Sequence, residues 1–225
     1  MMATRGKSLS ERRKGIVLNG SSQRNEALLN KAKSNAIKKS LEKHGLEIYD
    51  EKVLSMSEVR ENLINVLPKE KFSAEFDSAK TNPDGGILYI KNKSGEKFPI
   101  LVSETKNQES EGNAIERVGK DIRVLESRML GESIFPYLVF CQGEGFKEGK
   151  SHLASKLFGM SLCRGANKLN VRDVGDNLKA PSFFYQGDTW SVSKMSELME
   201  RCIDISIKYY LKKYGGKKNF IRKAG

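Results

Sequence analysis

The sequence predicts an α/β fold in which helices flank both faces of a central mixed β-sheet. Apolar residues at 87–90 and 98–102 are separated by Asn92-Lys93-Ser94-Gly95, which is typical of a β-hairpin. A continuous apolar run at 137–141 suits a buried third strand. Between them lies an amphipathic segment with helical spacing of its apolar residues Ile115, Val118, Ile122, Leu125 and Met129. Two strands, a helix and a third strand on one sheet imply a mixed core with a right-handed crossover.

The N-terminal part of the chain is expected to carry a flexible arm and two helices. Residues 1–24 mix Arg, Lys, Ser and Gly without periodicity, and such a basic arm either tracks phosphates or is simply a solvated terminus. Residues 25–44 have the apolar spacing of a helix that stops before a glycine, and 46–49 suit a short strand. Ser55 and Glu58 have capping-box spacing before a second helix. The cap explains Glu58 more simply than a role as an extra metal ligand.

After the third strand, a glycine-rich stretch at 143–151 looks like a phosphate-binding loop. That motif needs four residues between its first and last glycines, but counting from Gly143 gives five and from Gly145 gives three. We therefore expect a mobile basic loop rather than a nucleotide site. Residues 151–181 have no clear pattern and several basic side chains, which fits a DNA-facing loop region.

The C-terminal part predicts a strand at 182–186 and a long helix at 193–214. The expected inner side of that helix consists of Met195, Leu198, Met199, Cys202, Ile205 and Tyr209, as core or partly as a subunit interface. Residues 215–225 are expected to form a frayed basic tail. The main domain would thus span 25–214.

Composition bounds the class of protein. A length of 225 residues with 38% hydrophobic residues suits one domain, and a net charge of +12 favours a polyanionic partner. The charge gathers at the ends, since residues 1–50 hold 11 Lys and Arg against 5 acids, and 201–225 hold 8 against 1. Apolar runs long enough for a membrane span and export signals are both lacking in the sequence, so no membrane association and a cytoplasmic location are expected.

The cysteines and histidines point away from thiol or imidazole chemistry. Three widely spaced cysteines fit buried thiols in a reducing compartment better than zinc or a disulfide. His44 lies at a predicted helix C-terminus, where an imidazole is favourable anyway, and His152 has no obvious partner. Both histidines are expected to be structural or solvent-facing.

Charged residues at the ends of the predicted hairpin form a candidate catalytic group. Asp84 precedes the first strand, and Glu104 and Lys106 lie near the end of the second. Side chains alternate along a strand, so Glu104 and Lys106 point the same way, and antiparallel pairing brings Asp84 back towards them. Two carboxylates can hold a divalent cation for phosphodiester hydrolysis, and a lysine can orient the attacking water. A solvated strand end with a surface ion pair is the alternative on this spacing alone.

The helix that follows carries side chains suited to reading DNA. Its first turn contains Asn113, Glu116 and Arg117, types that hydrogen-bond base edges, and Gly112 allows close approach of the backbone.

These motifs resemble those of the EcoRI-type restriction endonucleases, a branch of the PD-(D/E)xK nucleases. The resemblance runs in order over about residues 50–210, through 83–87, 104–108, the highly specific 112–117, Phe135-Pro136-Tyr137 and, more weakly, 185–188. It implies a restriction-endonuclease-like core and a homodimer that uses Mg²⁺ to cut both strands of double-stranded DNA at a palindrome containing AATT, leaving 5′-phosphate ends. It also implies a cognate DNA methyltransferase as a genetic partner.

The resemblance further assigns roles to individual residues. Asp84, Glu104 and the backbone carbonyl of Thr105 would hold Mg²⁺, with Lys106 beside the attacking water. DNA recognition would involve Gln108, Glu109, Ser110, Gly112, Asn113, Ala114, Glu116 and Arg117.

Two departures from the family pattern matter. Only the six residues 107–112 separate the catalytic lysine from the recognition asparagine, so the family's DNA-wrapping arm is shortened or supplied by the basic ends. Glu109 and Ser110 stand where the family has apolar residues that touch the outer base pair. A carboxylate there can accept from cytosine N4, so the pair outside AATT is expected to differ from that of GAATTC or not to be read.

Two other functions are compatible with the sequence. A repair or structure-specific nuclease would share the catalytic core, but the base-reading helix argues against it. A non-catalytic DNA-binding protein would exploit the charge, but carboxylates facing phosphates would bring it no advantage.

Overall fold

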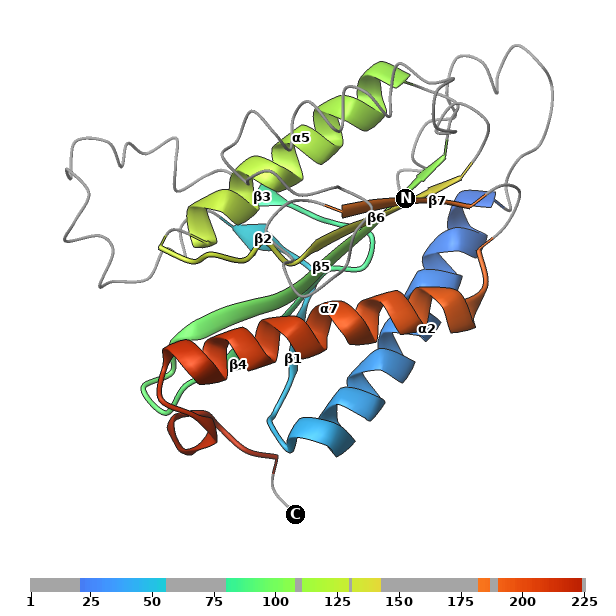
Figure 1. The fold of residues 1–225 in the computed structure, drawn as a ribbon. Coiled ribbons are helices and arrows are strands. Elements are labelled where there is room, and N and C mark those ends of the chain that lie inside the picture. The colour runs from blue at the N-terminus through green and yellow to red at the C-terminus, as the bar shows by residue number, and fades with distance from the viewer. Residues whose placement is uncertain are drawn as a thin grey trace, which may run out of the picture.

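The computed structural model describes residues 21–55, 80–107, 111–129, 131–142, 182–186 and 190–223. Its centre is a five-stranded sheet in the order β1-β4-β5-β6-β7 (Figure 1). The strands are β1 (Tyr49–Glu51), β4 (Ile87–Lys91), β5 (Lys97–Asn107), β6 (Tyr137–Gln142) and β7 (Ser182–Gln186). β1, β4 and β5 pair antiparallel, whereas β5, β6 and β7 pair parallel, so the expected mixed sheet is confirmed.

Helices cover both faces of the sheet (Figure 1). α5 (Glu111–Arg128) lies on one face, close to the small antiparallel sheet of β2 (Leu54–Ser55) and β3 (Lys80–Thr81). α2 (Ser21–His44) and α7 (Val192–Lys213) pack on each other across the opposite face. Because both faces are covered, Ile100, Leu101 and Val102 are all buried although successive side chains of β5 point to opposite faces.

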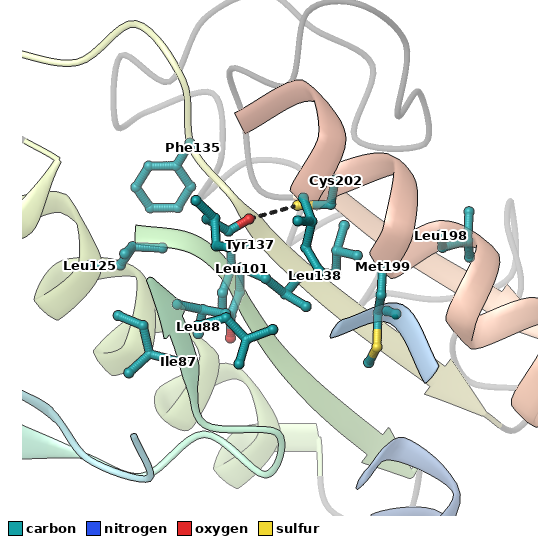
Figure 2. Close-up of a cluster of buried hydrophobic side chains, with 14 of the residues drawn as sticks. Ile87, Leu88, Leu101, Leu125, Phe135, Tyr137, Leu138, Leu198, Met199 and Cys202 are labelled. Carbon is teal, nitrogen blue, oxygen red and sulfur yellow. Dashed lines mark hydrogen bonds between the residues drawn. The ribbon is translucent and has the colours of Figure 1, made fainter. Parts of the chain in front are cut away.

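The core joins the sheet to α5 on one side and α7 on the other (Figure 2). α7 buries Met195, Leu198, Met199 and Cys202 as expected, but its remaining apolar core positions are Ile203, Ile207 and Tyr210. The predicted Ile205 and Tyr209 are only partly buried. The helix is apolar around more than one face because it packs on both the sheet and α2, and a single-stripe prediction cannot separate these two surfaces.

The C-terminal segment is ordered against the sheet, so the expectation of a frayed tail is wrong. After the short helix η4 (Lys217–Asn219), Phe220 is buried and its ring lies 5.5 Å from that of Phe98. The Ile221 amide donates to the Lys91 carbonyl at 2.9 Å, next to the β4–β5 turn. Burial of one large apolar side chain therefore holds in place a segment whose basic residues led us to expect a solvent-exposed tail.

Other boundaries differ modestly from expectation. α2 begins at Ser21, inside the predicted arm, and the strand expected at 46–49 is displaced to Tyr49–Glu51. Leu46 instead forms an isolated bridge with Arg222 of the C-terminal segment. The arm before residue 21, the helix after Ser55 and the loops at 143–181 lie outside the described residues, as do His152 and Cys163.

The described cysteines and histidine are structural. Cys141 and Cys202 are free and buried, and burial raises the pKa of both thiols. Cys202 Sγ contacts the Ile100 carbonyl at 3.7 Å (Figure 2). His44 ends α2 and lies 2.9 Å from the Asp204 carboxylate, while burial lowers the pKa of its imidazole. Within the described part of the chain, no helix combines the length and the apolar character that crossing a membrane requires.

Candidate active site

The turn before β4 places Asp84 against β5. The Gly86 amide donates to the Pro83 carbonyl and the Gly85 amide to the Ser103 carbonyl, both at 2.9 Å. The turn fits tightly, since a Cβ atom on Gly85 would lie 2.0 Å from Ser103 Oγ. Glycine at this position therefore lets the chain reach β5, so that antiparallel pairing brings Asp84 beside Glu104 as the sequence predicted.

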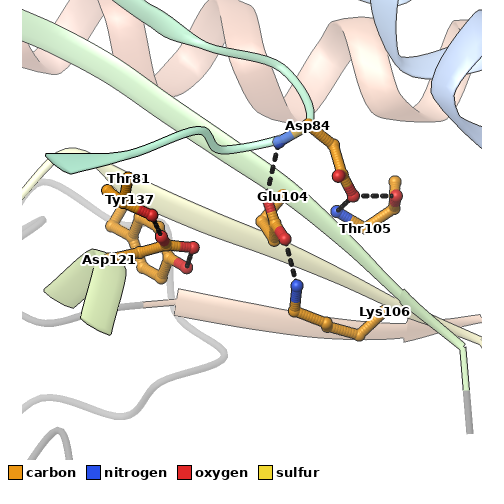
Figure 3. Close-up of polar contacts among 7 residues, drawn as sticks. All are labelled: Thr81, Asp84, Glu104, Thr105, Lys106, Asp121 and Tyr137. Carbon is orange, nitrogen blue, oxygen red and sulfur yellow. Dashed lines mark hydrogen bonds and ion pairs between the residues drawn. The ribbon is translucent and has the colours of Figure 1, made fainter. Parts of the chain in front are cut away.

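Thr105 holds the Asp84 carboxylate. Asp84 Oδ2 accepts hydrogen bonds from the Thr105 amide at 3.1 Å and from its hydroxyl at 2.6 Å (Figure 3). Sequence reasoning considered only the Thr105 carbonyl and missed this contact. The pairing of Thr105 with a carboxylate 21 residues earlier depends on the strand register, which the sequence alone does not reveal.

Glu104 and Lys106 form a buried ion pair on the same side of β5 (Figure 3). Lys106 Nζ donates to Glu104 Oε1, while Glu104 Oε2 accepts from the Asp84 backbone amide at 2.5 Å. Burial raises the pKa of Glu104 to about 7; the Lys106 charge lowers it, and the Asp84 charge raises it further. A surface ion pair at a solvated strand end does not describe this group, because only 1% of Glu104 and 6% of Lys106 is exposed.

The donor set of this group fits a hard divalent cation. Two carboxylates lie close enough for the charge of Asp84 to raise the pKa of Glu104, and a cation between them would favour their ionised forms. Within the described residues, no cluster of three or more His, Cys, Asp or Glu side chains could hold a metal ion. Mg²⁺ commonly uses one or two carboxylates and completes its shell with water, so two are sufficient.

Lys33 of α2 supports the turn from the opposite side. Its side chain is buried, and Nζ lies 2.9 Å from the Gly85 carbonyl and 2.6 Å from the Asp50 carboxylate. The ammonium therefore links α2 and β1 to the residue that follows Asp84. Sequence reasoning treated this lysine only as part of a basic N-terminal region.

Lys33→Met should lower the free energy of unfolding by about 1–3 kcal/mol, because a buried carbonyl loses its donor. Cleavage of DNA should slow as well, since the Asp84 turn loses its support. Lys39→Met is the matched control: Lys39 lies on the same helix as Lys33 and pairs with Glu200 of α7, but its side chain is 64% exposed, so a change within about 0.5 kcal/mol is expected. Urea denaturation measures the free energy of unfolding of both variants. Equal losses of stability in Lys33→Met and Lys39→Met would contradict the role given to Lys33.

The residues expected to read DNA fall around the start of α5. Gln108, Glu109 and Ser110 lie outside the described residues, between the end of β5 and α5. Gly112, Asn113, Ala114 and Glu116 belong to the first turns of α5, and Arg117 is exposed. β5 thus leads from the acidic group into the helix that begins with the predicted recognition residues.

Comparisons with known proteins agree with this arrangement. Residues 12–156 match the restriction endonuclease EcoRI family. The type II restriction enzyme RsrI of Cereibacter sphaeroides is 33% identical over 114 residues, covering 41% of this chain and 41% of RsrI. The type II restriction enzyme EcoRI of Escherichia coli is 28% identical over 197 residues, covering 65% of this chain and 70% of EcoRI. This chain belongs to the EcoRI restriction endonuclease family.

Proposed function

We propose that the protein is a type II restriction endonuclease that uses Mg²⁺ to hydrolyse both strands of double-stranded DNA. Its target would be a short palindrome containing AATT, and its products would carry 5′-phosphate ends. The observation that carries the proposal is the contact of Asp84 with the buried Glu104–Lys106 pair on β5, the strand that precedes α5. The resemblance at 112–117 supports the target sequence.

The contacts of the side chains support the catalytic roles that we propose. Asp84 and Glu104, with the Thr105 carbonyl, would hold the cation. When bound, Mg²⁺ would polarise the scissile phosphate and lower the pKa of the attacking water. Glu104 anchors Lys106 through its ion pair, so the ammonium is kept where it can orient that water and offset charge developing on the phosphate.

The same proposal covers the organisation of the molecule. Residues 25–214 would form one restriction-endonuclease-like catalytic and recognition domain, with Gln108, Glu109, Ser110, Gly112, Asn113, Ala114, Glu116 and Arg117 reading the major groove. The residues before α2 would form a basic arm, and the ordered segment after α7, which packs Phe220 on Phe98, would add basic side chains at the other end of the chain. A homodimer would match the two-fold symmetry of a palindrome. The protein would act in the cytoplasm beside a methyltransferase that protects the host DNA.

The alternatives are less well supported. A structure-specific nuclease would need shape recognition rather than a helix whose sequence contains Asn113 and Arg117 in its first turns. A protein that only binds DNA would gain nothing from burying Glu104, whose ionised form burial disfavours.

Incubation of the full chain with phage DNA of known sequence and Mg²⁺, followed by sequencing of the ends, tests the proposal. Discrete fragments whose ends share a palindrome around AATT are expected, and their flanking base pair shows whether Glu109 and Ser110 change the outer specificity. Nicking without sequence preference would favour the structure-specific nuclease. Tight, salt-sensitive binding without cleavage would favour the DNA-binding protein.

A further inference from the structure

Asp121 is a buried carboxylate in the middle of α5. Only 2% of the residue is exposed, and it lies on the side of the helix that carries the buried Val118 and Leu125. Arg117 lies one turn earlier and is exposed, and residues four apart are neighbours on a helix, so the charge of Arg117 opposes the rise in the pKa of Asp121 that burial causes. Because Asp121 shares the buried side of α5, it faces the sheet, and its burial calls for polar partners there.

Those partners come from two other elements. Asp121 Oδ1 accepts a hydrogen bond from the Thr81 hydroxyl of β3, and Oδ2 accepts one from the Tyr137 hydroxyl at 3.2 Å (Figure 3). Thr81 lies three residues before Asp84, and Tyr137 begins β6, paired with Val102 of β5. α5 is thus joined by hydrogen bonds to the segment that leads into Asp84 and to the neighbour of the strand that carries Glu104.

The charge of Asp121 also acts on the catalytic group. The Lys106 ammonium opposes the rise in the pKa of Asp121 that burial causes, and the Asp121 charge contributes to the raised pKa of Glu104. Figure 3 shows the Asp121 cluster next to the Glu104–Lys106 pair, which agrees with the electrostatic effect of each on the other. The Lys106 ammonium therefore lies in the field of two buried carboxylates, one from β5 and one from α5.

We propose that Asp121 is a positioning residue that couples DNA recognition by α5 to catalysis by Glu104 and Lys106. This inference rests on the proposed function. Four residues of helix rise about 6 Å, so the turn with Arg117 and the turn with Asp121 move as one rigid unit. When the first turns of α5 bind the cognate base pairs, Asp121 is held in its position near Lys106. A changed base pair that displaces α5 also displaces Asp121, and the catalytic group loses its alignment.

The consequence is a specific effect on discrimination. A displacement of about 1 Å at a catalytic group can cost about 100-fold in rate. With the coupling intact, a wrong base pair slows cleavage beyond its effect on binding. Without the coupling, cognate cleavage slows, and cleavage at a site with one changed base pair slows less.

Asp121→Asn and Tyr137→Phe test this coupling from its two ends. Asparagine keeps the shape of the side chain but removes its charge, and phenylalanine removes one hydrogen bond while leaving the carboxylate. Ser127→Ala is the matched control, because Ser127 is also buried on α5 but its hydroxyl donates to the Val124 carbonyl of the same helix.

Single-turnover cleavage is measured on a duplex carrying the palindrome mapped with the wild type, and on duplexes with one base pair of it changed. Duplex affinity is measured with Ca²⁺ in place of Mg²⁺. For Asp121→Asn we expect cognate cleavage about 10- to 100-fold slower, affinity within about threefold, and a ratio of cognate to changed-site cleavage at least about tenfold lower. Tyr137→Phe should shift the ratio in the same direction by less, and Ser127→Ala should leave it within about twofold.

An unchanged ratio in both test variants would overturn the coupling, whether cleavage is unaffected or falls equally on all duplexes, because a merely structural role lowers all rates together. If Asp121→Asn does not fold, the ratio of cognate to changed-site cleavage in Tyr137→Phe alone tests the coupling. A wild type that cuts without sequence preference would instead refute the proposed function, so the two failures are distinguishable.

Discussion

Glu104→Gln should lower the single-turnover rate of DNA cleavage by at least about 1000-fold. Removal of one group that stabilises developing charge typically costs 100- to 1000-fold, and this substitution removes a proposed cation ligand as well as the anchor of Lys106. The rate is measured on a mapped cognate duplex at saturating protein. Glu197→Gln is the control, because Glu197 is exposed on α7 and pairs with Lys194 one turn away, far from any proposed cation ligand in the chain order.

The same variant should become more stable relative to the wild type as pH rises. The pKa of Glu104 is raised to about 7 in the folded protein, from an ordinary value of 4.5. Between these values the unfolded chain loses the proton that the folded protein keeps, so the wild type loses stability as pH increases. Glutamine does not titrate, so the difference should grow by about 1–3 kcal/mol from pH 4.5 to 7 and then level off.

Urea denaturation at a series of pH values, without divalent cations, measures this difference. Addition of Mg²⁺ at pH 8 should then stabilise the wild type and leave Glu104→Gln unaffected, since a ligand stabilises only the folded state that binds it. A variant that keeps cleaving DNA would remove Glu104 from the active site. A difference that does not vary with pH would mean that the folded protein ionises Glu104 as easily as the unfolded chain does.

The sequence predicted the elements whose signal is local. The hairpin of β4 and β5 follows from two apolar stretches around a turn that contains a glycine, and α5 follows from the spacing of Val118, Ile122 and Leu125, all three of which are buried. The nearness of Asp84 and Glu104 also follows from this pairing. Local patterns suffice there because the partners are joined by a short turn.

The residues that the sequence did not reveal depend on distant partners. Lys33 meets Gly85 across 52 residues, and Asp121 meets Thr81 across 40. In the sequence, each is one charged residue on an amphipathic helix, and only the packing of that helix on the sheet tells a buried charge from a solvated one. The order of the C-terminal segment was not predicted for the same reason, since the partners of Phe220 and Ile221 lie on the β4–β5 hairpin.

Gly86→Ala should lower the free energy of unfolding by about 3 kcal/mol or more, the largest effect on stability that we expect. Gly86 has a φ of +66°, and a Cβ atom there would lie 2.4 Å from the backbone carbonyl oxygen of Glu51 in β1. The left-handed conformation alone costs an alanine about 1–2 kcal/mol. The clash adds to this cost because it involves the backbone of a paired strand, and neither β1 nor the turn can move without disturbing the other.

Gly45→Ala separates these two contributions. Gly45 has nearly the same φ, +65°, but a Cβ atom there would meet nothing within 4 Å, so only the conformational cost of about 1–2 kcal/mol is expected. Urea denaturation measures the free energy of unfolding of both variants. The additional loss in Gly86→Ala gives the energetic cost of the clash with β1. Equal losses would mean that the turn relaxes away from β1. A larger loss for Gly86→Ala, accompanied by slower DNA cleavage, would mean that β1 fixes the turn on which Asp84 depends.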